Sequence, residues 1–171
     1  ASDRFGFTAD GYCGDSPQDN TSTSDGFAFF AQRRLLPQAR RAFDHSLIDK
    51  RDFDRIEALC GRLREFLPEH PAVLIHGDLW TGNLHACGNG ELALIDAGAV
   101  HHGWAECDLA MSILFGELPR PFFAAYEAEA HIEGDWRQRA VLLNLYHLLN
   151  HLNLFGSSYL GGVRSAIDRF H

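Results

Sequence analysis

The stretch His76-Gly77-Asp78-Leu79-Trp80-Thr81-Gly82-Asn83, followed by Leu94-Ile95-Asp96, carries the most specific pattern in this chain. It holds an aspartate, an asparagine five residues later and a second aspartate thirteen residues beyond that. In the catalytic loop of kinases, an Asp takes the proton of the acceptor hydroxyl, and an Asn and a downstream Asp bind magnesium. The spacing therefore predicts Asp78 as the catalytic residue and Asn83 and Asp96 as Mg²⁺ ligands.

The flanking residues predict how these side chains meet. The apolar run 72–75 is expected to form a strand that leads into the loop of Asp78. Residues 84–86 and 91–95 surround an Asn-Gly pair, which predicts a β-hairpin. Such a hairpin brings Asn83 and Asp96 together, where two hard oxygen ligands suit one Mg²⁺. The structural alternative is that Asp78 forms a turn and Asn83 caps a loop.

Composition sets the general class of the protein. The chain has 171 residues, which we interpret as a single domain, 1–171, with its own core. Its 46% hydrophobic and 22% charged residues are typical of soluble globular proteins. The net charge of −8 argues against nucleic-acid or anionic membrane partners. No apolar stretch approaches the roughly 18 residues of a membrane span. The cysteines are widely scattered and fit a reducing compartment, so we expect a cytoplasmic protein.

Cysteines and histidines do not form a recognisable metal motif in the sequence. The four cysteines are widely scattered without a Cys-x-x-Cys pair, which indicates free thiols rather than a disulfide framework or a zinc knuckle. The ten histidines include the adjacent His101 and His102, whose side chains would face opposite ways in a strand. We therefore predict no zinc site.

Periodicity predicts an α+β fold that is mostly α-helical and carries the catalytic and metal residues on a small hairpin. Residues 1–24 are polar and are expected to be largely loop. Asp25 and Asp52 are candidate N-caps, Pro37 is a candidate kink, and residues 97–103 read as a flexible loop. The expected helices are 26–43, 52–67, 106–115, 119 or 121 to 129, 135–155 and 157–170.

One predicted helix has a polar stripe on an otherwise apolar surface. Asn144, His147 and His151 fall on one side of the segment 135–155 at helical spacing. Buried polar groups must be hydrogen-bonded or face a wet pocket. The stripe is therefore either a satisfied buried network or the wall of a polar substrate pocket.

Several motifs together resemble the fructosamine kinase (ketosamine 3-kinase) family. The string 76–83 and the string Glu106-Cys107-Asp108-Leu109-Ala110-Met111 are specific in combination, whereas His-Gly-Asp with a later Asp alone indicates only the wider aminoglycoside-phosphotransferase-like kinases. The similarity runs nearly end to end. Its other segments are 5–7, 18–20, 29–38, 95–96, 114–116 and 146–156.

The resemblance implies an ATP- and Mg²⁺-dependent kinase that phosphorylates a hydroxyl of a sugar-amine adduct such as a fructosamine. It implies the C-terminal lobe of a protein-kinase-like fold, with Asp78 as the base. Trp80 is expected either to pack against the sugar or to fill the core. The remaining predicted site residues are substrate contacts at His147, His151 and Glu106, and supports of the catalytic loop at His76 and Asp108, with Glu106 alternatively a support.

Two departures from the family pattern limit the interpretation. Asp96-Ala97-Gly98-Ala99 replaces the usual Asp-Pro-Ala, which leaves the sugar specificity open. The single lysine, Lys50, and the lack of a Gly-rich loop indicate that the N-terminal ATP-binding lobe is absent. We expect a fragment that is inactive alone and whose partner is the missing lobe.

Other hypotheses remain open at this point. The chain is alternatively a catalytically silent domain that binds a sugar or a partner, or a different aminoglycoside-phosphotransferase-like kinase. A further alternative is a metal-dependent hydrolase that uses Asp78, Asp96 and either His101 or His102.

Overall fold

The computed structural model describes residues 2–88, 90–130, 132 and 134–170. Within them the fold is mixed α/β, about half helical, with small two-stranded antiparallel sheets. The strands are β1 (Gly11–Cys13), β2 (Ser16–Gln18), β3 (Val73–Ile75), β4 (Leu84–Ala86), β5 (Leu92–Leu94) and β6 (His101–Gly103). The α-helices are α1 (Gly26–Phe29), α2 (Leu36–Asp44), α3 (Lys50–Cys60), α4 (Leu63–Phe66), α5 (Ala105–Met111), α6 (Arg120–Ala130), α7 (Trp136–Leu143), α8 (Leu145–Phe155) and α9 (Leu160–Asp168).

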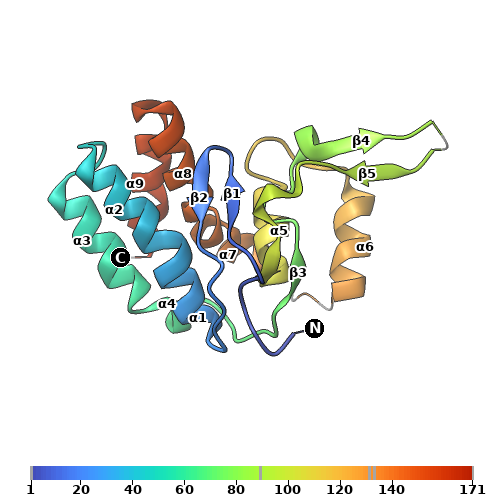
Figure 1. Cartoon of the computed structure of the whole chain (residues 1–171), viewed down its shortest axis with the longest axis horizontal. Helices are drawn as coiled ribbons and strands as arrows, with labels where there is room; N and C mark the ends of the chain where they lie inside the picture. Colours follow the sequence, from blue (N-terminus) through green and yellow to red (C-terminus); the bar gives the residue numbers. More distant parts are fainter. Residues whose placement is uncertain (1, 89, 131, 133, 171) are drawn as a thin grey trace.

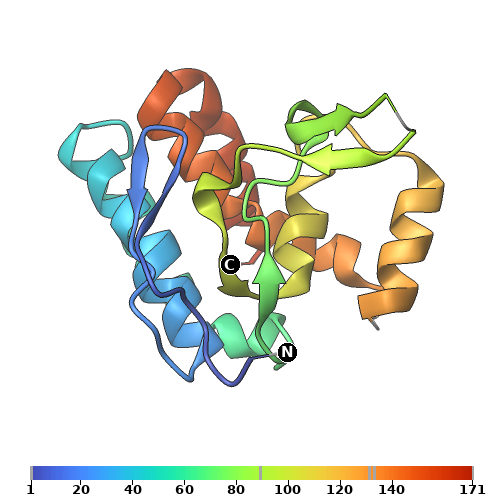
Figure 2. The ribbon, with the colours of Figure 1, turned by 45° about the vertical axis from the view of Figure 1, so that its right-hand side comes forward.

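The elements form two unequal parts. In Figures 1 and 2, α2, α3, α8 and α9 lie together at one side, while the β4–β5 hairpin and α6 lie at the other. The core joins both parts through fully buried side chains of α3, α5, α7 and α8, including Ile56, Leu109, Trp136 and Leu149. No described helix has the length and apolarity needed to cross a membrane.

The first predicted helix begins where expected and contains an irregular stretch. The Asp25 carboxylate accepts from the backbone N–H groups of Phe27 and Ala28, so Asp25 is the N-cap, as predicted. A π-helical segment, Phe30–Leu35, separates α1 from α2. Pro37 follows directly in the first turn of α2, where its missing N–H is tolerated. The π segment turns Arg33 and Arg34 toward the strands.

The second predicted helix starts earlier and is interrupted. The cap of α3 is Asp49, not Asp52, because the Asp49 side chain accepts from the Asp52 N–H. Asp52 is instead buried and accepts from Arg164 at 2.8 and 2.9 Å. The helix breaks at Gly61 before α4, so the prediction of one helix over 52–67 is wrong in its cap and its continuity.

A strand replaces part of the predicted loop at 97–103. A 3₁₀ turn covers Ala97–Ala99, and β6 then pairs antiparallel with β3, with Ile75 opposite His101. The polar sequence of β6 gives no strand pattern of its own. The strand forms because it pairs with β3, about 28 residues away, and hydrophobic periodicity does not predict such a non-local contact. Residues 1–24, which we expected to be largely loop, include the paired strands β1 and β2.

The C-terminal half is helical, but several of its helices are shorter than predicted. Helix α5 ends at Met111 rather than at 115, and α6 covers Arg120–Ala130. The predicted helix 135–155 is two helices, α7 and α8, which meet at Asn144. Asn144 donates to the Ala110 carbonyl of the neighbouring helix at 2.7 Å. The break between α7 and α8 therefore falls at a residue that bonds to a neighbouring helix. Asparagine also has a weak preference for helical conformation.

Candidate active site

Strand β3 leads directly into the loop that holds Asp78. Gly77 has φ +80°, and a Cβ atom there would lie 2.3 Å from the Ala99 carbonyl oxygen, so only glycine fits this turn. The Asp108 carboxylate accepts from the N–H of His76 at 2.8 Å and from the N–H of Gly77 at 2.9 Å. Two bonds to one buried carboxylate fix the backbone immediately before Asp78.

Burial of Asp108 has an electrostatic consequence. Desolvation raises the pKa of Asp108 to about 6, and the two backbone N–H donors act in the opposite direction by favouring the ionised form. The loop is therefore attached to a group that ionises close to neutrality. His76 adds a second attachment, since its Nε2 lies 2.9 Å from the Ile95 carbonyl oxygen, to which it donates. Both predicted supports, His76 and Asp108, contact the loop or its neighbours.

The hairpin brings the predicted metal ligands together. Strands β4 and β5 pair with Leu84 opposite Leu94, and the Ile95 N–H donates to the Asn83 carbonyl at 3.0 Å. Asn83 and Asp96 thus stand at the two ends of one hairpin, and the Asn89 of the predicted turn lies outside the described residues. The Asn83 amide also donates to the Asp78 carboxylate at 3.2 Å and to its carbonyl at 2.9 Å.

Asn83 and Asp96 carry oxygen atoms of the kind that a hard cation prefers. In the described part of the chain, the Asn83 amide oxygen and the Asp96 carboxylate receive no hydrogen bond or ion pair, so both oxygens are available. Asp96 adopts φ +59°, a left-handed conformation that is rare outside glycine and is concentrated at functional sites. An amide oxygen and a carboxylate are ligands that Mg²⁺ accepts beside phosphate and water.

Asp78 is half-buried at the wall of a pocket of about 450 Å³. Burial raises the pKa of its carboxyl above the ordinary value, the Asn83 hydrogen bond opposes the shift, and the nearby charge of Asp96 adds to it. The pocket is mainly aromatic on its other sides. Its lining includes Trp80, Phe115, His151, Phe155 and Tyr159.

Trp80 has a defined position in this pocket. Its ring meets Phe115 edge to face with centroids 6.4 Å apart. A Cβ atom on Gly82 would lie 2.3 Å from the indole, so glycine at 82 allows the ring to fold over the loop. Trp80 is only partly buried. Trp80 lines the same pocket as Asp78.

The predicted substrate contacts separate into two groups. His151 lines the pocket and its Nδ1 lies 2.8 Å from the His147 carbonyl oxygen. His147 is buried behind the wall, and burial lowers its pKa to about 3. Glu106 lies elsewhere, in a buried ion pair with Arg139 at 2.6 and 2.8 Å. Neither Glu106 nor His147 is among the residues that line the pocket at Asp78.

The hydrolase alternative receives no geometric support. His101 is buried, its Nδ1 lies 2.8 Å from the Ala99 carbonyl oxygen, and its ring packs on Phe29. Among the described residues, neither His101 nor His102 joins Asp78 and Asp96 in a cluster of ligand atoms. Neither His101 nor His102 is among the residues that line the pocket at Asp78.

The β1–β2 hairpin completes the pocket with residues that the sequence analysis missed. Cys13, at the end of β1, lines the pocket with Asn150 of α8. The Asn150 amide donates to the Cys13 carbonyl at 3.1 Å and to its sulfur at 3.3 Å. A lone cysteine in a polar N-terminal segment carries no local signal of this role, because the contact spans 137 residues.

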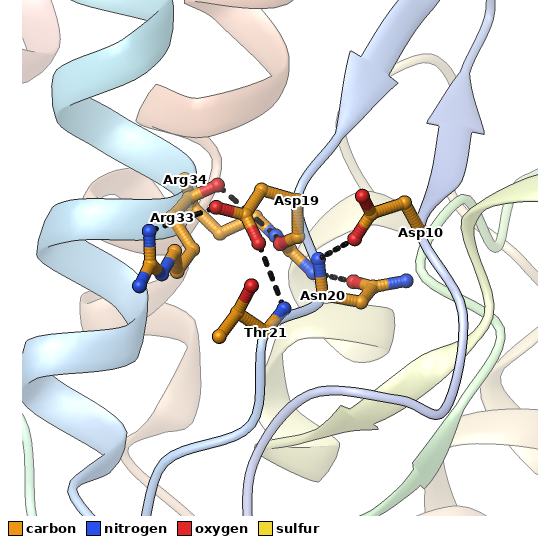
Figure 3. Close-up of polar contacts among 6 residues, drawn as sticks. All are labelled: Asp10, Asp19, Asn20, Thr21, Arg33 and Arg34. Atoms are coloured by element: carbon orange, nitrogen blue, oxygen red, sulfur yellow. Dashed lines mark hydrogen bonds and ion pairs between the residues drawn. The ribbon is translucent and has the colours of Figure 1, made fainter.

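A polar cluster attaches this hairpin to the π-helical segment (Figure 3). Arg34 is buried and donates to the Asp19 carbonyl and to the Asn20 side chain, each at 2.7 Å. Arg33 pairs with the Asp19 carboxylate at 2.8 Å. The Asn20 N–H donates to Asp10 at 2.9 Å. These bonds connect the chain segments on both sides of β1 and β2 to the helices, and so hold Cys13 at the pocket.

Comparison with known proteins gives the class of this arrangement. A family model described as fructosamine kinase matches residues 1–171. The "Probable ketoamine kinase" of Synechocystis sp. is 38% identical over 161 residues, covering 91% of this chain and 52% of that protein. The chloroplastic "Protein-ribulosamine 3-kinase" of Arabidopsis thaliana is 36% identical over 169 residues, covering 97% of this chain and 51% of that protein.

Solved structures agree with these sequence matches. The crystal structure of a "putative fructosamine-3-kinase" from Thermobifida fusca has a TM-score of 0.87 at 38% identity, covering 98% of this chain and 58% of that one. Another so described, from Haemophilus somnus, has a TM-score of 0.85 at 25% identity, covering 99% and 57%. The chain belongs to the fructosamine kinase family. It spans about half the length of these relatives.

Proposed function

We propose that this chain is the C-terminal, catalytic lobe of an ATP-dependent kinase that phosphorylates a hydroxyl of a sugar-amine adduct, a fructosamine or ketosamine. The observation that carries the proposal is the position of Asp78. It lies at a pocket wall, in contact with Asn83 and next to a backbone held by Asp108. Family membership and the kinase names of the relatives support the same class of reaction.

In the proposed reaction, the acceptor hydroxyl attacks the terminal phosphorus of ATP, the bond to the leaving ADP oxygen breaks, and the hydroxyl proton passes to Asp78. Phosphoryl transfer needs little covalent chemistry from the protein, so positioning and charge stabilisation supply most of the rate. A raised pKa suits Asp78 to hold that proton. Asn83 and Asp96 would hold Mg²⁺, which neutralises phosphate charge when bound.

The pocket composition supports a sugar-amine acceptor. The aromatic side chains of Trp80, Phe115 and Tyr159 offer flat apolar surfaces to a sugar ring or its amine-linked group. His151 adds a polar ring in the same wall. We propose that Trp80 and His151 contact the acceptor, and that Glu106 and His147 support the site from within the core.

The nucleotide requires residues beyond those of this chain. Lys50 lies on α3 and pairs with Asp54 at 2.5 Å, where both side chains are largely exposed, so it is not at the pocket. We propose that the Gly-rich loop and the phosphate-binding lysine of a kinase come from a separate N-terminal lobe. A cytoplasmic location remains part of the proposal.

Turnover of ATP with a fructosamine tests the proposal, using the protein that includes the ATP-binding lobe. Asp78→Asn should lower kcat by about 10²–10⁴-fold, the range expected for loss of a general base. Asp54→Asn, the same chemical change on exposed α3, should leave kcat unchanged. If Asp78→Asn retains full turnover, the role of Asp78 is wrong. If the wild type shows no turnover with any ketosamine, the alternative of a silent binding domain gains support.

A further inference from the structure

A second set of ligand atoms meets at Asp78, on the side of the pocket formed by β1 and α8. The Cys13 sulfur, a carboxylate oxygen of Asp78 and a ring nitrogen of His147 all lie within 4.8 Å of one another. These residues come from three separate parts of the chain. The Cys13 Sγ and His147 Nδ1 atoms are 4.0 Å apart.

We propose that Cys13, Asp78 and His147 form a binding site for Zn²⁺ or a similar borderline transition-metal ion, distinct from the Asn83–Asp96 magnesium corner. One sulfur, one imidazole nitrogen and one carboxylate oxygen are all accepted zinc ligands, and three protein ligands with one open position is the usual arrangement of a non-structural zinc site. Mg²⁺ avoids sulfur and prefers oxygen. The ligand atoms at Cys13 and His147 therefore favour Zn²⁺ over Mg²⁺.

The distances suit a small closure onto the metal. Zinc bonds of about 2.0–2.3 Å in a tetrahedral site place ligand atoms roughly 3.3–3.6 Å apart. The Cys13–His147 separation of 4.0 Å exceeds this range slightly, and side-chain rotation can close such a gap. Cys13 and Asp78 both line the pocket, whereas His147 is buried behind them. The fourth position of the metal would therefore open into the pocket.

Charge also favours the metal complex. Zinc binding replaces the thiol proton of Cys13, which leaves to solvent, and the resulting thiolate and the Asp78 carboxylate neutralise the divalent ion. The Asn150 amide already donates to the Cys13 sulfur at 3.3 Å, an arrangement that suits an anionic sulfur. The complex is neutral, so it places no net positive charge beside the buried guanidinium of Arg34.

Occupation of this site would remove Asp78 from the acceptor hydroxyl. A zinc ion bound by Asp78 takes the carboxylate that should receive the proton, and its open position takes space in the pocket. The metal would thus be a competitive block of the kinase site rather than a cofactor. This consequence rests on the proposed function, whereas the metal binding itself does not.

Co²⁺ titration tests the site without ATP or sugar and with Mg²⁺ in excess. The wild type should bind one Co²⁺ with an intense near-ultraviolet sulfur-to-cobalt charge-transfer band, which Zn²⁺ then removes. Cys13→Ser should abolish the band. Asp78→Asn should keep the band and weaken Co²⁺ binding by at least about tenfold, because changing even a residue that only supports a metal ligand costs about tenfold or more. Cys87→Ser, the matched change at the β4–β5 hairpin, should leave band and affinity unaltered.

Three results would overturn the proposal. They are a band that survives in Cys13→Ser, a band that disappears in Cys87→Ser, and unchanged Co²⁺ affinity in Asp78→Asn. Should Cys13→Ser lose its native circular dichroism spectrum, the Asp78→Asn affinity decides the question, since that side chain is only partly buried. In turnover assays, Cys13→Ser should need at least about tenfold more Zn²⁺ than wild type for half-inhibition, each relative to its own uninhibited rate. Absence of turnover would contradict the proposed function and leave the spectroscopic result decisive for the metal site.

Discussion

Two groups of side chains, the Asn83–Asp96 corner and the Cys13–His147 corner, adjoin Asp78 and differ in almost every other property. The Asn83–Asp96 corner offers hard oxygens from the ends of one hairpin, and Asp96 is exposed. The Cys13–His147 corner offers sulfur and nitrogen from buried side chains 134 residues apart. The residues of the first corner lie close together in the sequence, whereas those of the second come together only when the chain folds. The two proposed ion sites would thus give one carboxylate two kinds of ion chemistry.

Apart from Asp78→Asn, the largest effect should come from removing a proposed Mg²⁺ ligand at the Asn83–Asp96 corner. Asp96→Asn removes the charged ligand proposed for Mg²⁺, and we expect kcat/KM to fall about 10³-fold, which corresponds to about 4 kcal/mol of transition-state stabilisation. The Mg²⁺ concentration for half-maximal rate should rise in the same steady-state titration. Asp54→Asn is the control on α3. A normal Mg²⁺ requirement in Asp96→Asn would remove Asp96 from the metal site.

Glu106 tests whether a buried acidic residue beside the site supports it or binds substrate. Glu106→Gln removes the buried carboxylate from Arg139 and leaves it only the Asp135 carboxylate, and we expect a loss of about 3 kcal/mol in the free energy of unfolding. Urea denaturation measures this change. KM for the sugar should stay within twofold of wild type under conditions where the variant is folded. A raised KM with normal stability would restore the prediction that Glu106 contacts substrate.

Asp108 tests how firmly the backbone before Asp78 is held. Asp108→Asn can accept only one of the two N–H groups of His76 and Gly77, and we expect a loss of about 1–3 kcal/mol of stability at pH 7. Because the folded pKa of about 6 lies above the unfolded value of about 3.9, the stability contribution of Asp108 is fully present below the unfolded value and is lost as pH rises through the folded one.

The pH dependence gives the same residue a second measurement. Unfolding free energies of wild type and Asp108→Asn, compared between pH 4 and pH 7, should show the wild type losing stability relative to the variant as pH rises. Because both proteins contain the same other titrating groups, the contributions of those groups to the pH dependence cancel in the difference. Parallel pH profiles would show that Asp108 keeps an ordinary pKa in the fold.

The smallest effect should come from the pocket wall. Trp80→Leu removes the aromatic surface, and we expect KM for the sugar-amine to rise about tenfold with kcat changed less, because stacking on an aromatic ring contributes about 1 kcal/mol and burial adds to it. Steady-state kinetics on a fructosamine measures this. An unchanged KM with lowered stability would assign Trp80 to core packing, the alternative that the sequence left open.

Local patterns predicted the local part of the fold. The Asp25 cap and the hairpin between Asn83 and Asp96 follow from neighbouring residues, and the structure contains both. The errors fall where distant contacts decide. Strand β6 forms because β3 pairs with it, and Asp52 is buried against Arg164 rather than used as a cap. Neither partner is visible in the periodicity of the segment itself.

The candidate site divides in the same way. The candidate residues Asp78, Asn83 and Asp96 could be predicted from the sequence because they lie within one segment of 19 residues. The separation of His151, at the pocket, from His147, behind its wall, depends on how α8 packs against β1. Glu106 was predicted as a possible substrate contact, yet a buried Arg139 from another helix holds it.

The sequence by itself determined the family, the kinase-type spacing and the ends of the hairpin, because motifs and turns are short-range and depend on adjacent residues. Only the tertiary structure decided that Cys13 and His147 meet at Asp78, that Asp108 binds the backbone of the catalytic loop, and that Glu106 belongs to an ion pair. Those contacts require the helices and the β1–β2 hairpin to pack around one core, and packing brings together residues that no local pattern connects.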